Sequence, residues 1–292
     1  MKPAPFSYHA PRTIEEAVVI LARLAPDDGR VLAGGQSLVP TMAFRLARPR
    51  HLIDINSVAG LDRLEVIEGK LCIGACVRHA AFERTITEGP LGRLMAEVVR
   101  HIAHHPIRNR GTFCGSIAHA DPASEWCALA AALDAEMVVA STRGVRVIMA
   151  HEFFRGVMTT ALEEDELLAE VRLPTLRNDV RFGFAEFSRR AGDFAIAMAV
   201  AIFRLQNGVI SESRIAIGGV EAVPRRIEAA EYALRGRVPN PDAFALAAEV
   251  AVKQLEPLDD ENISAAYRRD LVLAVVPQAL EQAQARSNGV GG

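Results

Sequence analysis

The chain has 292 residues, half of them hydrophobic, so it can bury a sizeable core and divide into two domains. Its 33 basic and 36 acidic residues are well mixed and give a formal net charge of −3, which argues against nucleic acid as a partner. The N-terminus has no apolar core of signal-peptide length, and no window approaches the roughly 18 apolar residues of a membrane span. We therefore expect a soluble, cytoplasmic protein.

The first half alternates helical and strand patterns. Thr13 and Glu16 have capping-box spacing, and an apolar face recurs at helical period over residues 13–25, which predicts a helix there. The other elements expected in this half are strands at 30–33, 51–55, 135–141 and 166–174, a hairpin at 64–77 turning at 68–70, helices at about 91–104 and 123–132, and a tight turn at 141–144 followed by a short strand.

The second half has a different order, with strands first and helices last. Long strands are predicted at 182–190 and 195–205, and Asn207-Gly208 is a strong hairpin turn before a third strand at 209–220. Helices are expected at about 226–235, 240–255 and 261–285. This order indicates an α+β domain in which helices cover one face of a sheet.

The stretch "VLAGGQSLVP", residues 31–40, places two glycines at a strand end. One interpretation is a tight turn that needs positive φ. The other is functional: without two β-carbons, backbone N–H groups can approach an anion such as a phosphate, and Ser37 can add a hydroxyl contact. The segment matches neither the dinucleotide-binding G-x-G-x-x-G pattern nor a Walker-type motif.

The stretch "RNRGTFCGSIAHADPASEW", residues 108–126, is a run of small residues that we expect to be irregular. Because it lacks the bulk of a core segment, we expect a ligand to fill the space beside it, with this loop and the first one holding the two ends of a pyrophosphate. Asp121 and Pro122 are expected to begin a helix as N-cap and first residue. Glu125 would lie in its first turn, to contact a ribose hydroxyl or to complement the helix dipole.

Metal ligation has weaker support in the sequence. His101 and His105 have i, i+4 spacing on the predicted helix, but nothing nearby completes a metal site, and complementing the helix dipole is the alternative role. The four cysteines, at positions 72, 76, 114 and 127, include no C-x-x-C pair. We expect buried free thiols rather than disulfides or metal ligands.

Taken together, these segments resemble the FAD-binding medium subunit of the molybdenum hydroxylases, which include aerobic carbon monoxide dehydrogenase and xanthine dehydrogenase. "AGGQSLVPTMAFRLARPRHLIDI" is similar to the family's first flavin loop, and "IRNRGTFCGSIAHADPASEW" to its second. The likeness continues through "FAEFSRRAGDFAIAMAVA", "IGGVEAVPRRIEAAE" and "YRRDLVLAVVPQAL" in the same order. It covers nearly the whole chain.

The resemblance implies a two-subdomain FAD-binding domain of the vanillyl-alcohol-oxidase type at residues 1–177, with subdomains at about 1–57 and 58–177. A C-terminal domain with a three-stranded sheet and helices would occupy residues 178–292. Phe194 would lie near the isoalloxazine ring. By position in the family's motifs, the cofactor-binding residues would be Leu32, Ala33, Gly34, Gly35, Gln36, Ser37, Leu38, Val39, Ile102, Ala103, Thr112, Gly115, Ser116, Ala118, Glu125 and Leu168.

The resemblance also implies an electron-transfer role. A molybdopterin centre on a large partner would oxidise the substrate, two-iron clusters on a small partner would relay electrons, and FAD on this chain would pass them to an external acceptor, in a dimer of heterotrimers. We expect no catalytic acid–base residue and no metal on this chain. The alternatives are a stand-alone flavin oxidoreductase, or a structural subunit that lost its flavin because Cys114 replaces a glycine of the family motif.

Overall fold

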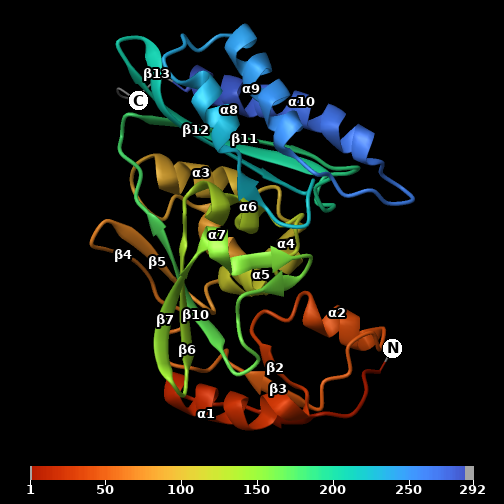
Figure 1. Ribbon diagram of the computed structural model, residues 1–292. Helices are drawn as coiled ribbons and strands as arrows, with labels where there is room; N and C mark the ends of the chain where they lie inside the picture. Colours follow the sequence, from red (N-terminus) through yellow and green to blue (C-terminus); the bar gives the residue numbers. More distant parts are fainter. Residues whose placement is uncertain (1, 287–292) are drawn as a thin grey trace.

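The computed structural model describes residues 2–286. The described residues form four sheets, one of which has only two strands. The other three are stacked along the molecule, with a small parallel sheet at one end, a five-stranded sheet in the middle and a four-stranded sheet under a layer of helices at the other end (Figure 1). Within the described residues, none of the helices has both the length and the apolar character needed to cross a lipid bilayer.

The first sheet is parallel, with strand order β1-β3-β2. Its strands are β1 (Ser7–His9), β2 (Gly29–Leu32) and β3 (His51–Asp54). Helix α1 (Ile14–Leu24) is capped by Thr13, whose hydroxyl accepts from the N–H of Glu16, as its sequence predicts. A 3-10 turn (Ala25–Asp27) follows α1, and the short helix α2 (Leu38–Ala43) follows β2. The carboxyl end of β2 therefore opens directly onto the Gly-Gly pair.

The middle sheet is antiparallel, with order β4-β5-β10-β6-β7. The predicted hairpin between β4 and β5 is confirmed, and it turns at Glu68 and Gly69 with φ of 49° and 76°. The strands of this sheet are β4 (Leu64–Ile67), β5 (Lys70–Gly74), β6 (Glu136–Ser141), β7 (Gly144–Met149) and β10 (Leu167–Pro174). The other elements of this region are η2 (His79–Glu83), α3 (Pro90–Val98), α4 (His105–Arg108), α5 (Phe113–His119), α6 (Glu125–Ala132), α7 (Ala150–Phe153), β8 (Phe154–Gly156) and β9 (Thr159–Thr160).

The helix expected at 91–104 ends early. α3 stops at Val98, and Ala103 then adopts φ 43°, which helical backbone does not allow. α4 starts separately at His105, so His101 and His105 do not share a helix and their expected i, i+4 relation was wrong. Nowhere in residues 2–286 do three or more metal-ligating side chains gather.

The stretch 108–126 is also more regular than expected. It contains α5, whose N-cap Thr112 accepts from the N–H of Gly115. The N-cap of α6 is Ser124, not Asp121. The Asp121 carboxylate instead accepts from the N–H of Ala123 in an Asx turn, the local alternative open to this side chain.

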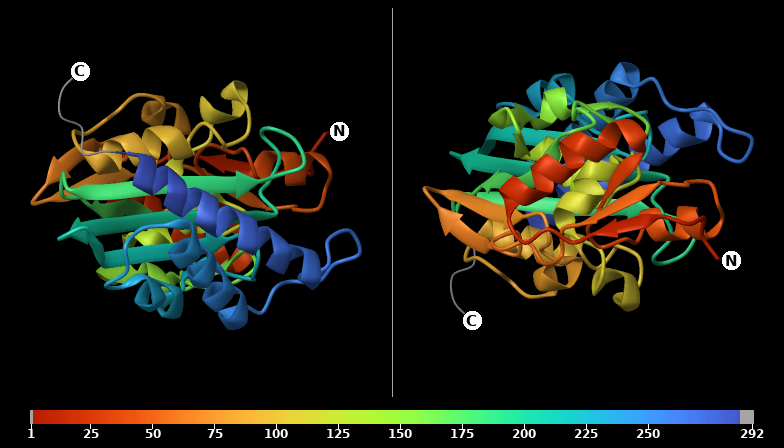
Figure 2. Two further views of the ribbon diagram at one scale, coloured as in Figure 1. Left: turned by 90° about the horizontal axis from the view of Figure 1, so that it is seen from above. Right: turned by 90° about the horizontal axis from the view of Figure 1, so that it is seen from below.

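The C-terminal sheet has four strands, one more than expected, in order β11-β12-β13-β14. They are β11 (Val180–Phe187), β12 (Ala197–Gln206), β13 (Val209–Gly218) and the two-residue β14 (Arg225–Arg226). The predicted hairpin at Asn207-Gly208 is confirmed, with positive φ at both residues. Helices α8 (Glu228–Leu234), α9 (Pro241–Gln254) and α10 (Ala265–Ala285) cover one face, α10 running obliquely across the strands (Figure 2).

Both faces of this sheet are buried, which explains the continuous apolar run in β12. Ala197, Ala199 and Ala201 belong to the core beneath the helices, whereas Met198 and Val200 belong to the core shared with the first half of the chain. Successive strand residues point to opposite faces, so an uninterrupted apolar strand fits only between two cores. The sheet therefore joins the helical layer to the rest of the molecule.

Candidate functional site

The first glycine-rich loop, residues 33–37, bonds its carbonyl groups to the protein and leaves its amides free. Asn56 donates to Ala33 O (2.8 Å), Gln36 to Gly34 O (3.2 Å), and the N–H of Val39 to Gly35 O (3.0 Å). Within residues 2–286, no acceptor takes the backbone N–H groups of residues 34–37. Four consecutive amides without a protein acceptor are a suitable binding surface for an anion.

The two glycines of this loop are needed for different reasons. Gly35 has φ 71°, a conformation that side chains disfavour. The φ of Gly34 lies outside that region, but a β-carbon there would lie 2.7 Å from the Cα of Gly111 and closer still to the carbonyl oxygen of Arg110. Gly34 is therefore bare because the two predicted loops touch at this point, and Gly35 because its backbone has the positive φ that the tight-turn interpretation expects.

The second loop contributes the start of α5. A β-carbon at Gly115 would lie 2.5 Å from the hydroxyl of Thr112, which caps the helix, and 4.0 Å from the β-carbon of Ala33 on the first loop. Cys114 occupies the first turn of this helix without positive φ. Its thiol is buried and donates to Ile73 O (3.3 Å). A cysteine therefore fits where the family motif has glycine.

A side-chain clasp fixes the two loops to each other. Arg78 donates to Asn56 Oδ1 (2.6 Å) and to Arg110 O (2.6 Å), while Asn56 holds Ala33. The next residue, His79, is buried beneath the second loop, and its backbone N–H donates to Gly111 O (3.0 Å). Sequence reasoning missed all three side chains because none belongs to a recognisable motif, and only the fold brings them to the loops.

His79 is held in its neutral form. Its Nδ1 accepts from the indole N–H of Trp126 (2.9 Å), and burial, with the nearby charges of Arg108 and Arg78, lowers its pKa to about 4. The buried neutral ring packs against Gly111 and so holds this part of the second loop in position.

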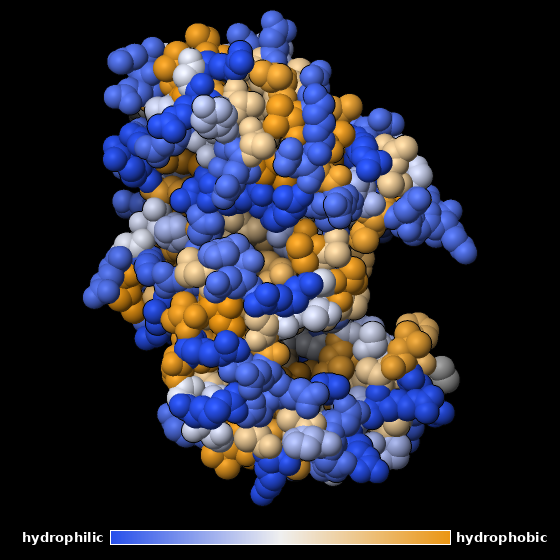
Figure 3. All heavy atoms as spheres, viewed as in Figure 1, coloured by the Kyte–Doolittle hydropathy of each residue, from blue (hydrophilic) through white to orange (hydrophobic). Residues whose placement is uncertain are grey.

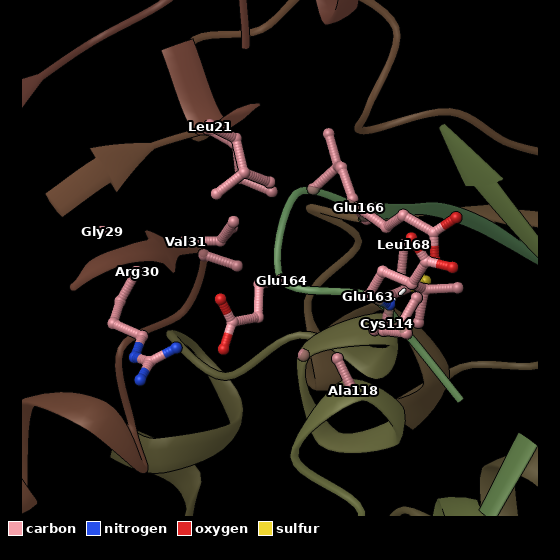
Figure 4. Close-up of a pocket in the computed structure, with 16 residues that line it drawn as sticks. Leu21, Gly29, Arg30, Val31, Cys114, Ala118, Glu163, Glu164, Glu166 and Leu168 are labelled. Atoms are coloured by element: carbon pink, nitrogen blue, oxygen red, sulfur yellow. Dashed lines mark hydrogen bonds between the residues drawn. The ribbon is translucent and has the colours of Figure 1, made fainter. Parts of the chain in front are cut away.

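A cleft of about 330 Å³ opens beside the two loops, between β2, α5 and the segment leading into β10. Of the predicted residues, Ala33, Gly115, Ala118 and Leu168 line it. Arg30 and Val31, from β2, lie on one side of the cleft, and Ala118 and Leu168 lie on the other (Figure 4). The remaining lining residues are mostly apolar, with charges contributed by Arg30, Glu163, Glu164 and Glu166. Its size and lining suit part of an organic ligand rather than a whole dinucleotide.

The other predicted residues lie around the loops but outside the lining of this cleft. Leu38 and Val39 begin α2, and Leu32 ends β2 with its side chain 3.2 Å from the position of a β-carbon on Gly35. Ile102 and Ala103 lie between α3 and α4, where their carbonyl oxygens accept from Arg108 (3.0 and 3.1 Å). Ser116, on α5, bonds to Ser124 (2.8 Å). Phe194 is 72% exposed, between β11 and β12. Their cofactor contacts stay predictions.

Glu125 is the first residue of α6 and is buried. Burial, and next the neighbouring Glu186 carboxyl, raise the pKa of Glu125 to about 8. Burial also raises the pKa of Glu186 to about 7, and its Oε2 has no hydrogen-bond partner within residues 2–286, the nearest cation-forming atom being His101 Nδ1 at 3.8 Å. A neutral Glu125 can donate a hydrogen bond as well as accept one.

Two family models match successive parts of the chain. Residues 4–176 match the FAD binding domain in molybdopterin dehydrogenase, and residues 182–283 match the CO dehydrogenase flavoprotein C-terminal domain. The chain belongs to this flavoprotein family. The expected α+β fold, a FAD-binding domain followed by a C-terminal domain, is thereby confirmed, as is the resemblance to the medium subunits.

Relatives of this flavoprotein cover almost its whole length. The nicotine 6-hydroxylase medium subunit of Paenarthrobacter nicotinovorans is 38% identical, over 98% of this chain and 100% of that protein. The carbon monoxide dehydrogenase medium chain of Hydrogenophaga pseudoflava is 35% identical, over 98% and 99%. The chain is accordingly a flavoprotein subunit of an oxidoreductase.

Solved structures agree with this fold. A carbon monoxide dehydrogenase chain from Hydrogenophaga pseudoflava superposes with a TM-score of 0.93 at 37% identity, covering 98% of this chain and 99% of that one. A quinoline 2-oxidoreductase chain from Pseudomonas putida 86 gives 0.91 at 37% identity, with the same coverage.

Proposed function

We propose that this flavoprotein is the FAD-binding electron-transfer subunit of a multi-subunit molybdenum hydroxylase, and that it passes electrons from iron–sulfur clusters on a partner, through FAD, to an external acceptor. The observation that carries the proposal is the contact between the two loops of small residues, where Gly34 lies against Gly111. Beside this contact are four backbone amides without a protein acceptor. A diphosphate group provides the anionic oxygens that such amides bind.

The residues present fit FAD. The amides of residues 34–37 would hold the diphosphate, and Thr112 and Ser116 lie at the second loop. The mostly apolar cleft beside Ala118 and Leu168 has room for one of the ring systems of the cofactor. Glu125, neutral and able to donate, would suit a ribose hydroxyl. When bound, FAD supplies the redox chemistry, exchanging one or two electrons, and the protein supplies position and shielding.

Several narrower points belong to the same proposal. The partners would be a small iron–sulfur subunit and a large molybdopterin subunit, in a cytoplasmic dimer of heterotrimers. The names of the relatives, "medium subunit" and "medium chain", support an assembly with other subunits. We also propose that the FAD-binding domain spans residues 1–177, with subdomains at about 1–57 and 58–177, and the C-terminal domain residues 178–292.

The structural alternative, a subunit that lost its flavin, rests on Cys114. Because Cys114 sits in right-handed helical backbone with its thiol in the core, it gives no steric reason for such a loss. The stand-alone oxidoreductase is the other candidate. It differs from the main proposal in its electron donor, which would be a small-molecule reductant rather than a partner subunit.

The test is to purify the chain and titrate it with FAD. We expect stoichiometric binding, seen as a shifted flavin absorbance and quenched fluorescence, and no turnover of NAD(P)H or small alcohols by the chain alone. Absence of binding at excess FAD would contradict the proposal. Turnover of such a reductant by the isolated chain would favour the stand-alone enzyme.

A further inference from the structure

Two buried carboxyl groups face the layer between the C-terminal sheet and the first half of the chain. Glu186 lies near the end of β11, and its side chain is 3% exposed. It pairs across β12 with Met198, which in turn pairs with Gly218, and a β-carbon on Gly218 would lie 3.1 Å from that of Ala128 on α6. Glu125 begins the same helix, so both carboxyls face this layer. Within residues 2–286, neither forms an ion pair with an arginine or a lysine.

His101 connects Glu186 with the protein surface. Its Nδ1 lies 3.8 Å from Glu186 Oε2, too far for a direct hydrogen bond, and within residues 2–286 that oxygen has no hydrogen-bond partner. The imidazole packs edge-on against Phe184, with 4.9 Å between the ring centroids, and is 38% exposed. Burial lowers the pKa of His101, although Glu97, itself paired with Arg286, opposes this. A neutral imidazole can accept a proton on one nitrogen and release one from the other.

The segment of His101 and the loop after Glu186 touch each other. His101 lies two residues before Ala103, which the family resemblance predicts as a flavin contact. Glu186 lies two residues before the loop 188–194. A β-carbon on Gly192 of this loop would lie 3.0 Å from the carbonyl oxygen of Ala103. The two titratable groups therefore lie beside a segment where the redox-active ring of FAD is expected.

The overall shape is consistent with this position. A deep notch separates the lobe that carries α2 from the part of the molecule that carries α4 and α5 (Figure 3). The loop whose amides would hold the diphosphate precedes α2, and the segment of His101 precedes α4. A cofactor held by its diphosphate at the first loop could therefore extend across the notch toward His101 and Glu186.

The chemistry of the proposed function requires protons at this site. Iron–sulfur clusters carry electrons alone, and two-electron reduction of a flavin with uptake of a single proton leaves a negative charge on its ring system. Burial raises the pKa of Glu186 to about 7, with opposition from the Ser188 hydroxyl. Burial, and next the Glu186 carboxyl, raise that of Glu125 to about 8, and Asp121 adds to this increase. Glu186 is thus the carboxyl that changes charge nearest to neutral pH, and a negative charge nearby would raise its pKa further.

We propose that Glu186 binds a proton when electrons reach the flavin and releases it when they leave, with His101 as its connection to solvent. The inference rests on the proposed function and deepens it by assigning a proton-transfer residue. Two electrons come from the partner's clusters and one proton binds to the flavin itself. The Glu186 carboxylate binds a second proton from solvent, and this proton returns to solvent through His101 when the electrons pass to the acceptor.

The experiment counts the protons bound per electron pair by the full-length chain loaded with FAD. The midpoint potential of the flavin is titrated spectroscopically with redox mediators, and its dependence on pH gives the proton number by linkage. Between about pH 7.5 and about pH 8.5, we expect about two protons in the wild type and about one in Glu186→Gln. Glutamine has nearly the shape of a protonated glutamate, so the melting temperature should not fall.

A buried carboxyl that is ion-paired provides the matched control. Glu231, on α8, is 8% exposed and paired with Arg226 (2.6 Å). Because it lies in another part of the fold and already has a cation beside it, Glu231→Gln should retain the proton number of the wild type.

A second variant tests the connection to solvent. In His101→Gln the proton number at equilibrium should not change, because Glu186 is still present. Proton uptake after flash photoreduction of the flavin, followed with a pH-indicator dye, should be slower by about tenfold or more. An unchanged rate of uptake would refute the role of His101.

Two results would overturn the inference about Glu186. One is the same proton number in Glu186→Gln as in the wild type. The other is a potential shifted by the same amount at every pH, which would make Glu186 a fixed polar neighbour of the flavin. Failure of the proposed function looks different, because a chain that binds no FAD would refute the function itself. A chain that binds FAD but has equal proton numbers in the two forms would refute the proton assignment alone.

Discussion

The contact between Gly34 and the second loop can be tested by adding a single methyl group. In Gly34→Ala the new β-carbon would lie 2.7 Å from the Cα of Gly111, where ordinary van der Waals contact begins near 3.4 Å. Both neighbours, the Cα of Gly111 and the carbonyl oxygen of Arg110, are backbone atoms that no rotamer change can move. The loops must therefore separate by about 0.7 Å or more.

The magnitude follows from overpacking. Forcing one extra carbon into a packed contact costs about 1–3 kcal/mol. If the free protein relieves the strain by opening the loops and FAD must close them again, this free energy is taken from binding. The dissociation constant for FAD should then rise about 5- to 150-fold, since each 1.4 kcal/mol is a factor of ten.

The assay is a fluorescence titration of FAD with the Gly34→Ala chain, beside its melting curve. Gly156→Ala is the control, because a β-carbon on Gly156 meets its nearest neighbour, Thr159, only at 3.8 Å. That variant should bind FAD as the wild type does. A Gly34→Ala chain with unchanged affinity would refute the idea that the touching loops form the flavin site.

Two further predictions concern buried groups. Cys114 borders the cleft, but its thiol is buried and donates to Ile73 O, so Cys114→Gly should change FAD affinity by less than about threefold. The same variant should lower the free energy of unfolding by about 1–2 kcal/mol, through the lost packing and a glycine in a helix. A large gain in affinity, measured by the same titration, would contradict this. Burial raises the folded pKa of Glu125 to about 8, so the stability that the protonated carboxyl contributes is complete below the unfolded pKa of about 4.5. That contribution is lost as the pH rises from there through 8, by up to roughly 5 kcal/mol. In urea unfolding, Glu125→Gln should lose less stability than the wild type between pH 5 and pH 8, and equal losses would be evidence against a buried carboxyl.

The sequence predicted the elements whose signals are local. The Thr13 cap, the Glu68-Gly69 and Asn207-Gly208 turns, and the long apolar strands all depend on neighbours in sequence, and the structure contains them. The length of α3 was overestimated because apolar residues continue past Val98, whereas the break at Ala103 is set by tertiary contacts: Arg108 binds the carbonyl oxygens of Ile102 and Ala103.

The sequence predicted which two loops form the candidate site, but not the helix and the side-chain contacts that hold them together. The small residues of both loops were visible in the sequence. The helix α5 was not predicted, because its small side chains give little of the hydrophobic periodicity from which a helix is recognised. The roles of Asn56 and Arg78 depend on contacts between segments 20 or more residues apart, and no spacing rule encodes them. The two-residue strand β14 is likewise defined only by its pairing with β13.

The sheet that is buried on both sides has a consequence for how this polypeptide could be divided. Cutting the gene near codon 178 would expose to solvent the Met198 and Val200 side of β12 on the C-terminal product. It would also expose α6 on the N-terminal product, although every residue of α6 is buried in the intact chain. Neither product should stay dispersed when made by itself. Evolution of this subunit into two separately encoded proteins would first require polar side chains in place of the apolar ones on both of those faces.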